Sequence, residues 1–266
     1  MTRKRTFRFE FATVVGVPAA LAIVVVAQYL EGAPVRALWQ PTAALVVFGG
    51  TFAAVLVSYP WSLVKRTAAA VRNTLFMQTD PVNRLLADIL NYAQISRRKG
   101  LIGLEAEFDR AEDGFLRMAL GFAVDGTSPK VTRQILEVES DARRERDDVP
   151  AEVLETAAGY APTLGILGAV LGLIHVMQSL SDPSKLGSGI AVAFVATVYG
   201  VSGANLLLLP LATRLRGESR HHALAREIVI EGMVAVQEGV SPRIIEQKLR
   251  GFLIVARRDD SARRAA

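Results

Sequence analysis

Four long uncharged stretches constrain this chain more than any other feature of its sequence. Four intervals between charged residues contain 20, 28, 26 and 28 residues without Asp, Glu, Lys or Arg. A helix needs roughly 20 apolar residues to cross a bilayer, and only a helix satisfies its own backbone polar groups inside lipid. The sequence therefore predicts an all-α membrane protein with four transmembrane helices. The expected spans cover about residues 11–30, 40–60, 158–180 and 187–212.

The charged residues, 21% of the chain, gather outside these stretches. They lie mainly at residues 65–155, between expected transmembrane hairpins at 1–64 and 156–213, and at residues 214–266. Helix boundaries are indicated by Asp80-Pro81, Lys99-Gly100 and Thr127-Ser128-Pro129. Both charged segments show helical periodicity. In the first, one apolar helix face consists of Leu85, Leu86, Ile89, Leu90 and Ala93. We therefore expect a large helical cytoplasmic domain between spans two and three, and a helical cytoplasmic C-terminal segment with a basic tail.

Basic residues near the first stretch set the expected orientation. They occupy positions 3, 4, 5 and 8, whereas the loops at residues 31–36 and 182–185 are short. By the positive-inside rule the N-terminus is cytoplasmic, and an even number of spans places the C-terminus there too. The first stretch resembles the start of a secretory signal, but its 20 uncharged residues exceed the apolar core of a usual signal and three more spans follow. We expect a retained membrane anchor.

Motifs of ordinary catalysis are missing from the sequence. It has no phosphate-binding glycine loop with lysine, no histidines at i and i+4, no serine elbow and no cysteine. His221 and His222 are adjacent and would point to different sides of a helix, which makes a poor metal site. His175 stands alone among apolar residues, so we favour a packed or hydrogen-bonded histidine over an ionisable intramembrane group. We predict no enzyme activity, no cofactor, no metal and no nucleic-acid partner.

Small residues recur at close-packing spacing in the third and fourth stretches. The two sets consist of Gly165, Gly168 and Gly172, and of Ala196, Gly200, Gly203 and Ala204. Such faces let helices approach closely. The approach is either within this chain or around a helix of another subunit.

Two prolines lie near the expected cytoplasmic ends of the same spans. Pro162 suits the first turn of the third span, where a proline is tolerated. Pro210 falls inside the fourth span, where a lost hydrogen bond and a kink are expected.

None of the four stretches contains Asp, Glu, Lys or Arg. A charge at the centre of a bilayer costs roughly 2.5–3.5 kcal/mol or more, so such residues are kept only where they are used. If the chain conducts protons, the titrating carboxylate must come from a partner helix that packs against spans three and four.

Several segments carry a resemblance to a known family. In chain order they read ALVVFGGTFAAVLVSYP, SRRKGLIGLEAE, APTLGILGAVLGLIHVM, AVAFVATVYGVSGANLLLLPLA and IVIEGMVAVQEGVSPRIIEQKLRGFL. Together they resemble the MotA/PomA family of bacterial flagellar stator subunits. The resemblance implies a homo-oligomer of several A-subunits around a pair of MotB-type subunits in the bacterial cytoplasmic (inner) membrane. An aspartate of the MotB-type span then carries the ion, and ion flow drives the rotor for motility and chemotaxis.

The resemblance also assigns roles along the ion path. Pro162 and Pro210 match the prolines that link ion binding to movement of the cytoplasmic domain, and Thr197 matches a threonine that faces the ion path. Ala169 stands where sodium-type members carry a second threonine. Sodium needs several oxygen ligands, whereas a proton needs a titrating carboxylate and a path of water or hydroxyls. Although Tyr199 and Ser202 could supply oxygens, we predict transport of a proton rather than sodium.

A charged pair in the domain at 65–155 matches the residues that meet the rotor protein FliG. The pair is Arg97 and Glu105. Arg98 lies seven residues before Glu105, in almost the same helical direction, and is expected to share the role. Without the resemblance, all three charges would be a solvated helix face.

Other functions stay open at this stage. ExbB/TolQ-like energisers use the same wall without a carboxylate, but they resemble a three-span plan. A secondary transporter would need an inverted repeat and a broken substrate-binding helix, and neither is evident. A membrane scaffold without ion conduction is the remaining alternative.

Overall fold

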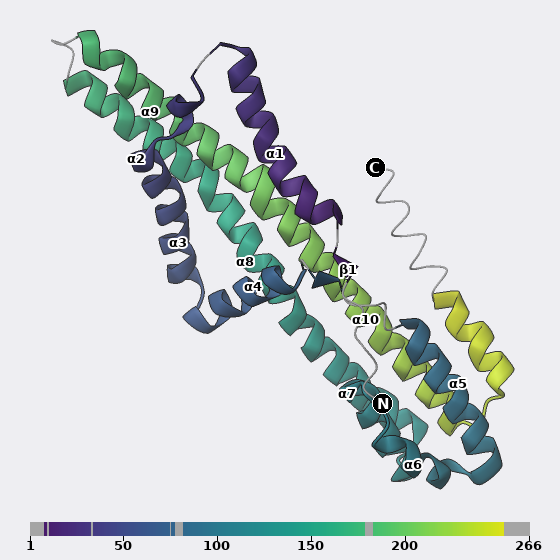
Figure 1. Ribbon diagram of the computed structural model, residues 1–266. Coiled ribbons are helices and arrows are strands. Elements are labelled where there is room, and N and C mark those ends of the chain that lie inside the picture. Colours follow the sequence, from purple (N-terminus) through teal and green to yellow (C-terminus); the bar gives the residue numbers. More distant parts are fainter. Residues whose placement is uncertain are drawn as a thin grey trace. The chain divides into compact units, whose positions relative to one another are not determined.

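The computed structural model describes residues 8–9, 11–32, 34–74, 76–77, 82–178 and 183–252, and most of them are helical (Figure 1). In this part of the chain the strands are β1 (Arg8–Phe9) and β2 (Phe76–Met77), which form one short antiparallel pair. The chain divides into two compact units. Unit 1 comprises residues 1–78 and 148–217, and unit 2 comprises residues 79–147 and 218–266. The predicted basic tail and the predicted helix start at Asp80-Pro81 lie outside the described residues.

Unit 1 contains the apolar stretches. Two long helices, α8 (Pro129–Gln178) and α10 (Leu209–Gln237), contribute residues to both units. The other helical elements of unit 1 are α1 (Phe11–Leu30), η1 (Val35–Leu38), α2 (Pro41–Ala44), η2 (Leu45–Gly49), α3 (Gly50–Ser58), α4 (Trp61–Thr74), α9 (Pro183–Ser202) and η4 (Gly203–Leu208).

Three helical stretches are long and apolar enough to cross a membrane by length and composition. They are Val35–Ser58, Pro129–Gln178 and Gly189–Gln237. These stretches contain all but the last or first two residues of the predicted second, third and fourth spans. The predicted first span is the 20-residue helix α1, of which Pro18–Leu30 counts as a shorter apolar helix. The fold is therefore all-helical with three long apolar helices, and the fourth span stays a prediction.

The helix that contains Pro162 does not begin at the membrane boundary. Helix α8 starts at Pro129, where the sequence Thr127-Ser128-Pro129 predicts a helix start, and continues for 50 residues through Pro150 and Pro162. The expected position of Pro162 in a first turn is therefore wrong. A proline inside a helix removes one backbone hydrogen bond, and the packing on both sides keeps the helix going.

Unit 2 has a conventional hydrophobic core. It is built from α5 (Val82–Lys99), η3 (Leu101–Leu104), α6 (Glu105–Phe108), α7 (Gly114–Val124), parts of α8 and α10, and a helix at 242–252. Asp113 caps α7 by accepting hydrogen bonds from the backbone N–H groups of Phe115 and Leu116. The largest fully buried side chains are Ile89, Leu104, Phe115, Leu116, Leu120, Leu136, Ile228, Met233, Ile245 and Leu249. The apolar face predicted for α5 packs into this core.

A charged cluster lies beside that core. Arg133 and Lys248 both donate hydrogen bonds to the carboxylate of Glu231 on α10. The Glu231 side chain is only 15% exposed. The hydrogen bond from Arg133 is the main cause that lowers the pKa of Glu231 to about 2, against the opposing effect of burial.

Candidate functional site

A seam of small residues joins α8 to α9 within unit 1. A Cβ added to Gly168 would lie 2.8 Å from the Ala196 Cβ, and one added to Gly172 would lie 3.0 Å from the Ala193 backbone. A Cβ on Gly200 would lie 2.5 Å from the Ala161 carbonyl oxygen. Both helices therefore approach through residues that have little or no side chain. Of the two interpretations of the glycine face, packing within the chain is confirmed for these residues.

The second apolar stretch closes the other side of this seam. A Cβ on Gly203 would meet the Phe48 ring at 3.1 Å, and that ring also lies 5.7 Å from the ring of Tyr199. Ala204 is buried with Ala158 and Ala161. The small-residue faces of α9 and η4 are thus occupied by helices of the same chain.

The structure brings two of the sequence-predicted ion-path residues to the seam. Pro162 is half-buried, and its Cα is 3.1 Å from where a Cβ on Gly200 would lie. Thr197 is half-buried opposite Gly165, with its Cα 3.4 Å from the equivalent position there. Ala169 follows the seam residue Gly168 and is half-buried. Pro162 and Thr197 therefore sit at one helix contact, although 35 residues separate them in the sequence.

Pro210 occupies a different setting. It is exposed near the start of α10, directly after the π-helical segment η4. Hydrogen bonds in a π-helix run to i−5 instead of i−4, so this segment changes the bonding pattern just where the proline lacks an N–H group. The fourth span thus departs from α-helical bonding beside Pro210, and the kink expected at this proline stays a prediction.

The hydroxyl groups near the seam are unequal candidates for ion contact. Tyr199 donates a hydrogen bond to the Leu38 carbonyl and accepts one from the Gln40 N–H group. Its oxygen is therefore engaged by the loop before the second apolar stretch. Ala169 offers no side-chain oxygen, whereas Thr197 and Ser202 are half-buried residues of α9 that carry a hydroxyl.

Carboxylates are absent from the apolar segments as the structure describes them. Residues 11–30, 41–58, 158–178 and 189–212 contain no Asp, Glu, Lys or Arg. Among the described residues, no group of three His, Cys, Asp or Glu side chains could hold a metal ion. His175 is exposed in the single chain, and the interpretation of it as a packed or hydrogen-bonded histidine stays a prediction. It lines an apolar cavity of about 350 Å³ together with Thr42, Val46 and Leu171.

An ion pair marks the end of the apolar part of α8 and α10. Arg216 donates two hydrogen bonds to Glu155, from Nε to Oε1 and from Nη2 to Oε2, each at 2.6 Å. These bonds lower the pKa of Glu155, which precedes the third apolar stretch. Sequence reasoning missed this pair, because 61 residues separate its members and no local pattern links them.

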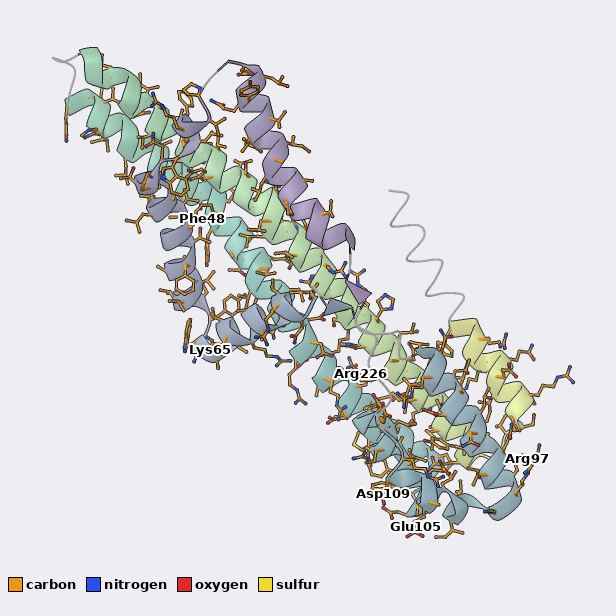
Figure 2. All side chains as sticks on the ribbon, in the orientation of Figure 1. Phe48, Lys65, Arg97, Glu105, Asp109 and Arg226 are labelled. Atoms are coloured by element: carbon orange, nitrogen blue, oxygen red, sulfur yellow. The ribbon has the colours of Figure 1, made fainter. Side chains whose placement is uncertain are left out.

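The predicted rotor-contact residues are exposed in unit 2. Arg97 and Arg98 lie in the last turn of α5, and Glu105 is the first residue of α6. Figure 2 shows Arg97 and Glu105 on adjoining elements at one end of the unit. The prediction that Arg98 and Glu105 share one face of a single helix is wrong, because α5 ends at Lys99 and Gly100 has a φ of 73°. Ile102 lies between the charges and is 65% exposed, which the sequence analysis did not single out.

The outward faces of the apolar helices carry large side chains. On α8 the exposed ones include Ile166, Val170, Leu173 and Met177, and on α9 they include Phe194, Val198 and Val201. Since the small residues pack inside the chain, these apolar faces are what unit 1 presents to its surroundings.

Sequence comparison identifies two matching families. A model of the MotA/TolQ/ExbB proton channel family matches residues 107–228, and a model described as motility protein A N-terminal matches residues 14–97. Motility protein A of Bacillus subtilis (strain 168) is 36% identical over 243 residues, which cover 91% of this chain and 90% of the relative. Chemotaxis protein PomA of Vibrio alginolyticus is 26% identical, with 92% and 95% of the two chains covered.

Two solved structures are similar to this fold. The structure of C. jejuni MotAB matches with a TM-score of 0.86 at 27% identity, over 91% of this chain and 95% of that one. The flagellar MotAB stator complex from Bacillus subtilis matches with a TM-score of 0.84 at 34% identity, over 94% and 98%. The similarity therefore extends over nearly the whole chain in sequence and in structure.

Proposed function

Because this chain belongs to the motility protein A family, we propose that it is the A-subunit of a bacterial flagellar stator. In this role it forms the wall of an ion channel with a MotB-type partner and converts ion flow into torque. The family model that matches residues 107–228 describes a proton channel family, and both similar structures are MotAB complexes.

One observation supports the assignment of the ion-binding carboxylate to the partner subunit rather than to this chain. The described apolar segments contain no carboxylate, and the small residues that could admit another helix are already packed inside the chain. An ion that crosses beside α8 and α9 therefore needs a titrating group from elsewhere. We assign that group to an aspartate on the membrane span of the MotB-type partner.

The proposed placement is the bacterial cytoplasmic membrane with four spans and both termini inside. Helix α1 supplies the first span in addition to the three long apolar helices. The basic N-terminal residues and the short loop after α1 support this orientation. Unit 2 then forms the cytoplasmic domain.

We further propose that several copies of this chain surround the partner pair and that unit 2 contacts the rotor protein FliG. The exposed charges Arg97, Arg98 and Glu105 form the contact, and exposed charges set specificity at interfaces more than they stabilise a fold. The transported ion is a proton, because Ala169 has no side-chain oxygen to bind sodium and the Tyr199 hydroxyl is already hydrogen-bonded to Leu38.

Ion flux in proteoliposomes tests this function. The complex of this chain with its MotB-type partner should carry protons in sodium-free buffer. The chain alone should not conduct, and an Asp→Asn change on the partner's span should abolish flux. Native mass spectrometry of the same complex should give several copies of this chain per partner pair. Conduction by this chain alone, or flux that requires sodium, would contradict the assignment.

A further inference from the structure

A second cavity opens at the end of unit 1 where α1 meets α9. It has a volume of about 400 Å³, and its walls come from α1, η1 and α9. The lining is largely apolar and includes Val25, Val35, Leu38 and Val198. Of the residues considered for the ion path, Tyr199 and Ser202 belong to its lining, whereas Pro162, Ala169, Thr197 and Pro210 and the rotor-contact residues do not.

The interior of this cavity has few polar groups that could bind an ordered water molecule. Its lining includes two hydroxyls, on Tyr199 and Ser202, and that of Tyr199 is already bonded to Leu38 and Gln40. Several wall residues remain open to the outside, with Val25 40% and Val198 36% exposed. Ordered water is favoured only where two or more polar partners are present, so this cavity suits an apolar occupant.

The rim of the cavity carries a cation and an aromatic ring. Arg36 and Trp39 both belong to the lining, and Trp39 is 79% exposed. Arg36 is exposed too, and it forms no ion pair with any residue in the described ranges. Both residues lie in the short segment between the apolar helices α1 and α2, and the end of an apolar helix is where arginine and tryptophan anchor a protein at the surface of a bilayer.

We propose that this groove binds an anionic phospholipid, with one acyl chain between α1 and α9 and the phosphate on Arg36. A basic group at the mouth of an apolar pocket between membrane helices matches the two chemically different parts of such a lipid. A partner helix fits less well, because a helix is about 10–12 Å wide with its side chains, so 400 Å³ would hold only about one turn. The inference concerns lipid binding and does not depend on torque or ion flux.

Lipid retention measured by native mass spectrometry tests the proposal. The purified full-length protein, with and without its MotB-type partner, is delipidated in detergent and titrated with phosphatidylglycerol or phosphatidylcholine of the same acyl chains. We expect phosphatidylglycerol to bind about fivefold more tightly, as a cation near the membrane surface contributes about 1 kcal/mol toward an anionic headgroup.

Two variants separate the headgroup site from the acyl-chain site. Arg36→Gln should remove the preference for phosphatidylglycerol, whereas Val198→Phe should fill the groove and weaken both lipids. Lys65→Gln is the matched control, because Lys65 also lies beside a tryptophan, with its Nζ 5.3 Å from the Trp61 ring, but lines neither cavity. Val201→Phe is the control for added bulk on α9, since Val201 is 46% exposed and does not line the groove.

Four outcomes would overturn the proposal. Equal retention of the two lipids by the wild type, or an unchanged preference in Arg36→Gln, would exclude the headgroup contact. Competition by glycerol phosphate as strong as that by the intact lipid would show that a free anion, not a lipid, binds Arg36. Loss of lipid binding when the MotB-type partner is present would show that the partner covers the groove.

Discussion

Different kinds of packing stabilise the interiors of the two units. In unit 2 large side chains such as Phe115 and Leu116 fill a core, and Glu231 joins two basic residues at its edge. In unit 1 the tightest contacts run between backbones, where Gly200 meets Ala161. Water drives large apolar groups together in the first case, whereas lipid is as apolar as leucine and close packing must replace that force in the second. The comparison predicts that the two units respond to different substitutions.

The largest effect should follow from a cavity in unit 2. Leu116 is 1% exposed, and Leu116→Ala should lower the free energy of unfolding by about 2–5 kcal/mol. Thermal melting followed by circular dichroism would measure it. Ile102→Ala is the control, since Ile102 is 65% exposed and should change little. If the two changes had equal effects, burial in the core of unit 2 would not be what stabilises this unit.

The addition of a single methyl group at the seam between α8 and α9 should destabilise unit 1. Gly200→Ala places a Cβ 2.5 Å from a backbone oxygen, and we expect a loss of about 1–3 kcal/mol. The same change at Gly159, on α8 with nothing within 4 Å, should be neutral or stabilise the helix by up to about 1 kcal/mol. Melting temperatures of both variants in one detergent decide the matter. A harmless Gly200→Ala would mean that the seam is not closely packed in solution.

Acid should weaken unit 2 through Glu231. Its pKa is about 2 in the folded chain and 4.5 for the unperturbed group, so its contribution is complete above about pH 4.5 and is lost as the pH falls toward 2. The difference in melting temperature between wild type and Glu231→Gln should therefore be constant near neutrality and shrink below about pH 4.5. Glu227→Gln, an exposed change on the same helix, should show no such convergence.

A weaker electrostatic contribution is expected at the boundary of unit 1. Glu155→Arg and Arg216→Glu should each lower stability, and the double exchange should recover part of the loss. Because both side chains are about one third exposed, we expect a coupling energy of about 1 kcal/mol. A double-mutant cycle of melting curves provides the measurement. Additive losses would show that Glu155 and Arg216 contribute to stability independently of each other. The units would then differ in packing alone.

The exposed charges should have the smallest effect on folding and a large effect on motility. Arg97→Glu and Glu105→Arg should change stability by less than about 0.5 kcal/mol, since both side chains are exposed. Swimming assays should nevertheless show impaired motility if these residues meet the rotor. Lys130→Glu, another exposed charge of unit 2, should swim normally. Normal swimming of both reversals would remove Arg97 and Glu105 from the contact.

Local signals in the sequence were sufficient for much of the fold. Segregated charge located the apolar helices, glycine spacing located the seam, and Thr127-Ser128-Pro129 located the start of α8. These features depend on residues within a few turns of one another. Propensity did not reveal that α8 runs on through Pro162, because packing from distant segments decides whether a helix survives a proline.

The features that were missed join residues far apart in the chain. Glu155 bonds to Arg216 across 61 residues and Tyr199 to Leu38 across 161. The exposure of His175 likewise depends on which helices pack beside it. For Arg98 and Glu105, a local signal was available in Gly100, whose positive φ ends the helix. The roles of the ion-path and rotor-contact residues rest on family resemblance and remain predictions.

The π-helical segments have a consequence for how these helices are compared among relatives. Each adds bonding to i−5, which changes the rotational phase of everything that follows along the axis. Successive residues of an α-helix differ by about 100° in azimuth, so one surplus position turns the next segment by a similar angle. A single helical wheel drawn through α9 and α10 would therefore assign lipid-facing and channel-facing positions wrongly on one side of η4. Azimuths should be assigned separately before Gly203 and after Leu208.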